Sequence, residues 1–207
     1  LTQMQSIMQN QIDRFAEHVF KEGTPVRGLQ YIYENDLQYV KINDNDTAGA
    51  DANTAAFVGT KITGSTSGLT ALVTDFKLGS EAAVPNTKTL YVKYLRGLAN
   101  NTTQFLSGET LTSNASINCV VVTQNSTSGD VVGTGSSIDF KEGILFTKDH
   151  FVRVPEQKTI LGRYDANTNL RVGFDINETI TQQENDTTLL DPAQGSYNYA
   201  APGADRL

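Results

Sequence analysis

The sequence has few of the side chains that most often carry catalysis: one cysteine, two histidines and no tryptophan among 207 residues. Cys119 has no partner for an intrachain disulfide, and its apolar run INCVVV indicates a small buried hydrophobe. His18 lies in a helical pattern. His150 follows Asp149 in a strand pattern, where neighbouring side chains point to opposite faces, so no triad is indicated. We therefore expect that the protein is not an enzyme and that it binds neither a cofactor nor a metal ion.

Positive charge and long apolar runs are also scarce. The chain has 16 Lys and Arg against 23 Asp and Glu, a net charge of −7. A surface that follows phosphate groups needs an excess of positive charge, so a nucleic-acid partner is not expected. No apolar run approaches the roughly 18 residues of a membrane span, so a membrane partner is not expected either. The 38% apolar content suits a β-rich protein with polar loops.

Residues 1–21 carry the strongest helical pattern, an apolar stripe with no Gly or Pro inside it and with Gly23 and Pro25 just beyond. The stripe packs either on the sheet of its own chain or on copies of itself around a symmetry axis. If the helix packs on copies of itself, the apolar stripe is wider than a two-helix seam needs, which favours three copies. The proposed interface, flanked by Ile7, consists of Leu1, Met4, Met8, Gln11, Ile12, Phe15, His18 and Val19.

Two parts of the chain show the period-two alternation of β-strands. Residues 29–33 and 37–42 predict a hairpin, with Glu34, Asn35 and Asp36 as its turn. Residues 138–180 predict a meander whose last strand alternates Leu170, Val172, Phe174 and Ile176. The expected fold class is α+β, mainly β: an N-terminal amphipathic helix, and an antiparallel hairpin and meander sheet.

Residues 57–132 are predicted to be an inserted small β-barrel or sandwich, with residues 1–45 and 133–207 forming a mounting domain that ends in an arm. The insertion repeats itself: GTKITGSTSGLTALVT from Gly59 aligns without a gap with GETLTSNASINCVVVT from Gly108. Each copy predicts a strand, a Ser/Gly turn and a strand, although Ser- and Thr-rich sequence can produce such a repeat by chance. The identical pairs are Gly59/Gly108, Thr63/Thr112, Ser67/Ser116, Val73/Val122 and Thr74/Thr123.

Two further groups of residues are candidates for contacts with partners. After residue 180 the chain loses periodicity and becomes rich in turn residues. Its apolar side chains need a covering surface such as a neighbouring subunit; they are Leu189, Leu190, Tyr197 and Tyr199. In the strongest strand pattern of the insertion, Tyr91 and Tyr94 offer ring faces to a glycan.

Three motifs carry a resemblance to a known family: LTQMQSIMQNQIDRFAEHVFKEG, FKEGILFTKDHFVRVPEQ and LLDPAQGSYNYAAPGADRL. They resemble virion structural proteins of contractile-tailed bacteriophages, common in cyanophages, of the baseplate or proximal tail-fibre type. The resemblance implies a non-enzymatic structural part of the virion tail whose partners are other tail proteins and, as a homotrimer, itself. The alternatives are a carbohydrate- or receptor-binding module that contacts a host surface glycan and, less favoured, a glycan depolymerase.

Calcium should not stabilise this protein. Asp44, Asp46 and Gly49 match the first, third and sixth positions of a calcium loop, but Ala48 and Ala55 replace the fifth and twelfth. Without the bidentate twelfth ligand, millimolar calcium chloride should leave the melting temperature unchanged in differential scanning fluorimetry. Sodium chloride of equal ionic strength is the control, and a concentration-dependent rise of several degrees with calcium alone would contradict the prediction.

Overall fold

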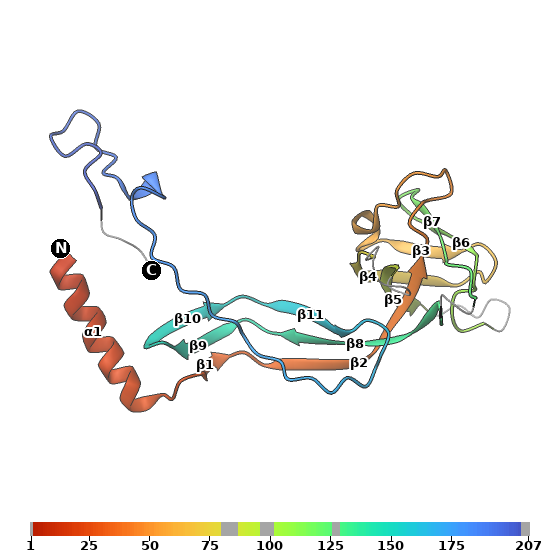
Figure 1. Ribbon diagram of the computed structural model, residues 1–207, viewed down its shortest axis with the longest axis horizontal. Helices are drawn as coiled ribbons and strands as arrows, with labels where there is room; N and C mark the ends of the chain where they lie inside the picture. The colour runs from red at the N-terminus through yellow and green to blue at the C-terminus, as the bar shows by residue number, and fades with distance from the viewer. Residues whose placement is uncertain (1, 80–86, 96–101, 126–128, 204–207) are drawn as a thin grey trace. The chain divides into compact units, whose positions relative to one another are not determined.

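The computed structural model is mainly β, with one N-terminal helix and antiparallel sheets, which confirms the predicted class (Figure 1). It describes residues 2–79, 87–95, 102–125 and 129–203. Contacts divide the chain into two units. The first unit consists of Leu1–Val26, Leu145–Val152 and Leu170–Leu207, and the second of Arg27–Ile144 and Arg153–Asn169.

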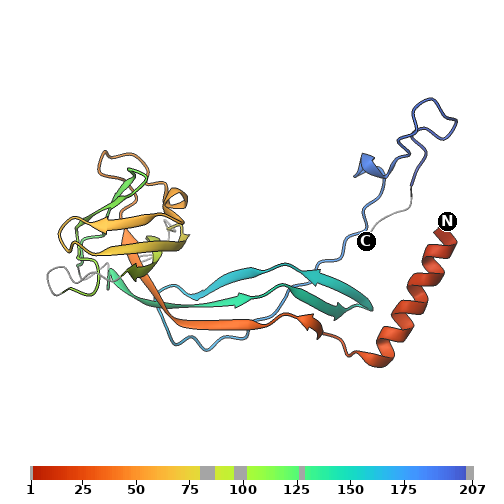
Figure 2. The ribbon, with the colours of Figure 1, turned by 180° about the vertical axis from the view of Figure 1, so that it is seen from behind.

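Two antiparallel sheets hold the strands (Figure 2). The three-stranded sheet has the order β1 (Thr24–Gly28), β9 (Gly143–Thr147), β10 (His150–Val154). The eight-stranded sheet has the order β11 (Gln157–Gly162), β8 (Val132–Phe140), β2 (Tyr31–Ile42), β5 (Lys88–Leu95), β4 (Thr70–Lys77), β3 (Lys61–Gly64), β6 (Thr110–Ser113), β7 (Asn118–Val120). Two short 3₁₀ helices, η1 (Thr54–Phe57) and η2 (Thr187–Leu189), complete the described elements.

Helix α1 (Thr2–Val19) confirms the helical pattern, and one side of it packs within the first unit. Ala16 is fully buried, and Asp13 Oδ1 lies 3.7 Å from His150 Nδ1. Just after the helix, the ring of Phe20 lies 5.8 Å from that of Phe146 and 5.6 Å from that of Phe151. Asp13, Ala16 and Phe20 follow each other at intervals of three and four residues, so these contacts lie on a single helical face.

The turn between β9 and β10 shows what a tight hairpin requires in this chain. Lys148 and Asp149 both have positive φ, 47° and 63°, as the favoured two-residue hairpin turn demands. The Glu22 carboxylate accepts hydrogen bonds from the Thr147 hydroxyl (2.6 Å) and the Lys148 amide (2.9 Å). These bonds lower the pKa of Glu22 and tie the turn to the segment after α1.

The hairpin predicted for residues 29–42 is wrong, because β2 is one continuous strand. It pairs with β8 on both sides of the polar residues, Glu34 opposite Ser137 and Leu37 opposite Gly135. The register shifts between Glu34 and Leu37, so the polar residues form a β-bulge and not a turn. Asn35 and Asp36 do not have the positive φ values found at Lys148 and Asp149.

The strand predicted at residues 170–176 is also wrong, and the strands before it do not form the predicted meander, because β8 pairs with β2 and β11 whereas β9 pairs with β1 and β10. Residues 167–180 have no regular secondary structure, and Leu170 and Ile176 are exposed. Alternation of apolar residues favours an extended backbone, but a strand also needs a neighbouring edge to complete its hydrogen bonds. Further on, the arm folds back on itself through an isolated bridge between Leu190 and Pro202.

Six strands of the second unit close into a small barrel. The sheet runs from β2 through β5, β4, β3 and β6 to β7, and an isolated antiparallel bridge joins Ile42 to Val121. Asn43 N donates to Val120 O (2.9 Å) and Val122 N to Lys41 O (3.0 Å), which completes the closure. The predicted barrel is therefore present, but its first strand is β2. The domain boundaries predicted from sequence separate β2 from its partner β5, whereas the structure joins them.

The barrel interior is the main hydrophobic core. It includes Cys119, which is buried as predicted and whose pKa is raised to about 12 by burial. Contributions come from every strand of the barrel, and the largest buried apolar side chains are Val40, Ile42, Phe57, Ile62, Val73, Leu90, Phe105, Leu111, Val121 and Val131. Because Val40 and Ile42 lie in β2, the core is shared across the predicted boundary.

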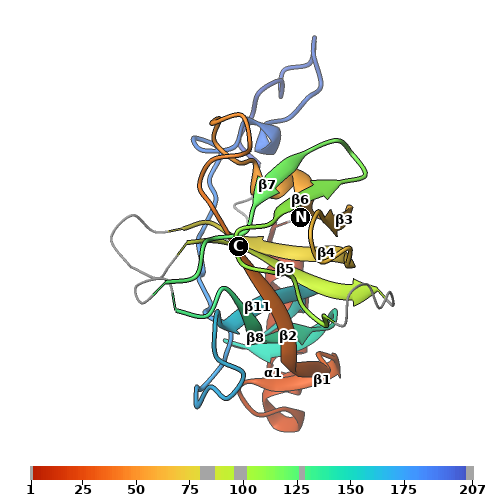
Figure 3. The ribbon, with the colours of Figure 1, turned by 90° about the vertical axis from the view of Figure 1, so that its right-hand side faces the viewer.

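The repeated sequence segments form two hairpins, β3 with β4 and β6 with β7 (Figure 3). Strands β3 and β6 pair antiparallel with Thr63 opposite Thr112, the same position in the two copies. Backbone bonds are reciprocal: Ser65 N donates to Thr110 O and Asn114 N to Lys61 O, both at 2.9 Å. The side chains of the same two residues form a second reciprocal pair of hydrogen bonds. Ser65 Oγ accepts a hydrogen bond from Thr110 N, and Asn114 Oδ1 accepts one from Lys61 N. A local two-fold axis therefore passes between the equivalent threonines.

Glu109 breaks this symmetry and fixes the turn between β3 and β4. Its carboxylate is buried, and it accepts hydrogen bonds from the amides of Thr66 (3.1 Å), Ser67 (2.9 Å) and Leu106 (2.6 Å) and from the Ser67 hydroxyl (3.0 Å). A Cβ at Gly64 would lie 2.6 Å from Glu109 Oε2, so only glycine leaves room for the carboxylate there. One side chain thus joins the two hairpins.

Glu109→Ala should destabilise the barrel by roughly 3 kcal/mol, because the buried amide and hydroxyl of Ser67 and the amides of Thr66 and Leu106 all lose their acceptor. Urea unfolding followed by circular dichroism measures the change. Glu156→Ala is the matched control, since Glu156 is exposed and forms a surface ion pair with Lys141. The control should change the free energy of unfolding by less than about 0.5 kcal/mol. Equal effects of the two substitutions would contradict the assigned role of Glu109.

Candidate interaction sites

The apolar stripe of α1 is not covered by the described part of the chain. Its large apolar side chains, Met4, Ile7, Met8, Ile12, Phe15 and Val19, are between 48% and 67% exposed. Gln11 and His18 are exposed among them, and Leu1 lies outside the described residues. The stripe lies on the side of the helix opposite Asp13 and Ala16, the residues that contact the chain itself. Of the two packing alternatives, the one on the chain's own sheet is not observed.

The arm places its apolar residues in two different settings. Leu189 is buried, Leu190 is half-buried, and Leu189 O accepts a hydrogen bond from Gly203 N (2.9 Å), so the two leucines help to hold the arm's own fold. Tyr197 and Tyr199 are exposed, Tyr197 completely. The predicted contact with another surface therefore concerns the two tyrosines.

Tyr91 cannot touch a glycan, so this part of the predicted contact is wrong. Its side chain is fully buried in a cluster with Leu37 and Tyr39, and Tyr164 packs against them. The Tyr39 and Tyr164 rings lie 4.9 Å apart, and Lys41 Nζ lies 4.2 Å from the centroid of the Tyr164 ring. Burial lowers the pKa of Lys41 and raises that of Tyr91. Sequence reasoning missed this cluster because its members come from three distant segments.

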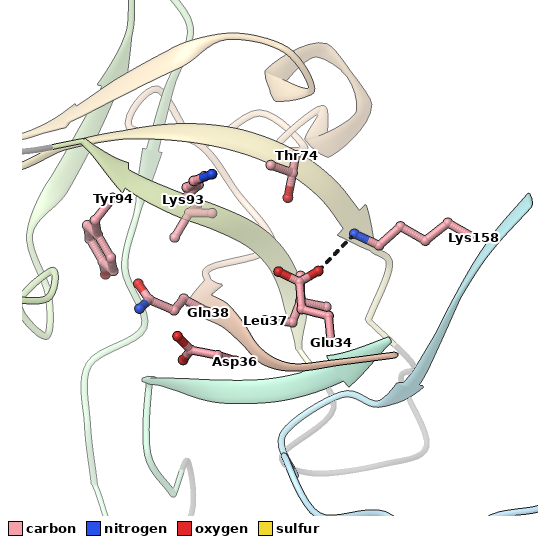
Figure 4. A pocket seen from close by; sticks show the side chains of 9 residues that line it. Glu34, Asp36, Leu37, Gln38, Thr74, Lys93, Tyr94 and Lys158 are labelled. Carbon is pink, nitrogen blue, oxygen red and sulfur yellow. Dashed lines mark ion pairs between the residues drawn. The ribbon is translucent and has the colours of Figure 1, made fainter. Parts of the chain in front are cut away.

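Tyr94 lies three residues further along β5 and lines a pocket of about 330 Å³ at the β2 bulge (Figure 4). Its hydroxyl accepts a hydrogen bond from Phe105 N (3.0 Å), and burial raises its pKa to about 12. In the pocket, Lys158 Nζ lies 3.6 Å from Glu34 Oε2. The other lining residues are Asp36, Leu37, Gln38, Thr74, Val92 and Lys93. Strand alternation does not reveal this pocket, because the polar residues of the bulge that line it have the sequence pattern of a turn.

A lysine occupies the centre of the loop that resembles a calcium loop. Lys88 Nζ donates to the carbonyls of Asp44 (2.9 Å) and Ala52 (3.0 Å) and pairs with Asp51. Asp46 Oδ1 accepts from two backbone amides of its own loop. Within the described ranges, no group of three or more His, Cys, Asp or Glu side chains is arranged to hold a metal ion. The ammonium group of Lys88 thus supplies the positive charge that organises this loop.

No protein-family model, curated protein or solved structure matches the chain. Among residues 2–203, as far as the structure describes them, no helix has both the length and the apolar character needed to cross a membrane.

The buried phenols should make the protein sensitive to alkali. Burial raises the pKa of Tyr39 and of Tyr94 to about 12, and raises that of Tyr91. The folded state therefore keeps protons that the unfolded state loses above pH about 10. The stability contributed by each phenol is fully present below pH 10 and falls by up to about 1.4 kcal/mol per pH unit as the pH rises towards 12.

Urea unfolding at successive pH values from 8 to 11.5 tests this, with tyrosinate absorbance recorded in parallel. Tyr91→Phe should reduce the slope of stability against pH above pH 10. A free energy of unfolding that stays constant from pH 9 to 11.5 would contradict the assignment.

Proposed function

We propose that the protein is a non-enzymatic structural component of a contractile phage tail, of the baseplate or proximal tail-fibre type, that assembles as a homotrimer through α1. The observation that carries the proposal is the uncovered apolar stripe of α1. Large contiguous apolar surface exposed to water is rare in soluble monomers and indicates an interface. The resemblance of three sequence motifs to virion tail proteins supports the tail role and a location in the virion.

The geometry of α1 supports self-association. Asp13, Ala16 and Phe20 anchor one face to the first unit, which leaves the stripe pointing away from these contacts. Burying Phe15 in a helical bundle is worth roughly 1.5–3 kcal/mol per chain. In a three-fold bundle, copies of Gln11 and His18 can hydrogen-bond each other or a trapped water and so fix the register.

The arm supplies a second surface for assembly in the same unit. Tyr197 and Tyr199 lie in a segment that is held by the bridge between Leu190 and Pro202. Tyrosine is enriched at protein interfaces, because its ring buries apolar area while its hydroxyl keeps a polar partner. These tyrosines are suited to contact a neighbouring subunit or another tail protein.

Phe15→Asp should convert the trimer to a monomer, because each chain would bring a charge into the apolar seam. Sedimentation velocity at several concentrations measures the change. The matched control is Asn10→Asp, which adds the same charge to an exposed position outside the stripe and should leave the trimer intact.

Two results would overturn parts of the proposal separately. A wild-type chain that sediments as a monomer at all concentrations, with unchanged stability in Phe15→Asp, would remove the role of the stripe. Gold-labelled antibodies against the chain that fail to bind the tail of a phage encoding it would remove the tail assignment.

A further inference from the structure

We propose that the pocket at the β2 bulge binds an uncharged sugar ring of a glycan. The pocket lies in the second unit, whereas the proposed assembly surface lies in the first, so this inference goes beyond the structural role. Its volume of about 330 Å³ is within the range of small-molecule sites and can hold one or two sugar rings.

The bulge gives the pocket its polar wall. In a regular strand, side chains alternate between the two faces, but the bulge between Glu34 and Leu37 lets Glu34, Asp36, Leu37 and Gln38 all line one pocket. Figure 4 shows Asp36 and Gln38 side by side, with Glu34 next to Lys158. Bulges are frequent beside binding sites because they redirect side chains in this way.

Gln38 provides the observation that points to a ligand. Its Oε1 atom is buried and has no hydrogen-bond partner among the residues that the structure describes. An unsatisfied buried acceptor is costly, so this oxygen calls for a donor from a bound water or a ligand. A hydroxyl group placed in the pocket would donate to this oxygen.

The apolar wall is rigid. Val92, which is almost completely buried, and Tyr94 come from β5. The Tyr94 ring packs against Phe105 at 5.0 Å between centroids, and its hydroxyl is held by Phe105 N. A sugar combines apolar ring faces with hydroxyl groups, so a lining that contains both apolar and polar side chains matches both of its surfaces.

The charges of the lining favour an uncharged ligand. Glu34 and Asp36 contribute two negative charges, and Lys93 and Lys158 contribute two positive charges, so the pocket has no net formal charge. A site for a sialylated or phosphorylated glycan would need a positive excess. Balanced carboxylates and ammonium groups instead offer acceptors and donors to the hydroxyls of an uncharged sugar.

The test uses the full 207-residue chain on a glycan microarray that carries uncharged, sialylated and sulfated glycans, followed by calorimetric titration of the best uncharged glycan and of its terminal monosaccharide. Binding to uncharged glycans is expected. Binding of the free monosaccharide as well would show that the pocket recognises one ring, and binding of the glycan alone would show that it needs two.

The discriminating variant is Gln38→Leu. It should weaken glycan binding at least tenfold and leave the melting temperature equal to or above that of the wild type, because it removes an unsatisfied buried acceptor. Gln157→Leu, at an exposed position of β11 outside the pocket, should change neither quantity. Phe15→Asp should bind with unchanged affinity per chain, which keeps this inference separate from the proposed assembly. No binding to uncharged glycans, a preference for charged glycans, or binding that survives Gln38→Leu would overturn it.

Discussion

Strand β2 is the element on which the second unit depends. At its C-terminal end it is hydrogen-bonded on both sides: Tyr39 lies opposite Tyr91 of β5 and Gly133 of β8, and Val40 opposite Leu90 and Val132. The same strand therefore belongs to the barrel and to the ribbon that β8 and β11 form beside it. A Cβ at Gly133 would come within 2.9 Å of the Tyr39 hydroxyl oxygen, so the absence of a side chain there allows this double pairing.

The bulge in β2 connects the fold to its pocket. Because pairing with β8 resumes at Leu37, the strand continues into the barrel while its polar residues leave the ladder. Asn35 and Asp36 are exposed, and an interrupted ladder costs little where water can replace the lost hydrogen bonds. The sheet therefore keeps its continuity and gains a recess lined by acidic and amide groups.

The sequence predicted elements whose signal is local and failed where partners are distant. The stripe of α1, burial of Cys119 and the two related hairpins follow from spacing within a few residues. The turn predicted at Glu34 is a bulge, because polar residues between strands have the same pattern in both, and pairing with β8 on both sides distinguishes them. Burial of Tyr91 depends on Tyr39 and Tyr164, and the orphaned oxygen of Gln38 on the packing around the bulge. Neither the burial of Tyr91 nor the unpaired oxygen of Gln38 can be recognised from the sequence pattern around it.

The pairing of β2 with β8 also determines the order in which the chain can fold as it is synthesised. Tyr31 lies opposite Phe140, so 109 residues, the difference between 140 and 31, must follow Tyr31 before its partner exists. At 5–20 residues per second, this delay is roughly 5–20 s. The hairpins β3–β4 and β6–β7 need only local contacts, which form in microseconds. The edge of nascent β2 that pairs with β8 therefore stays unpaired during this delay, and a chain stalled before residue 132 would expose it to aggregation or to chaperones.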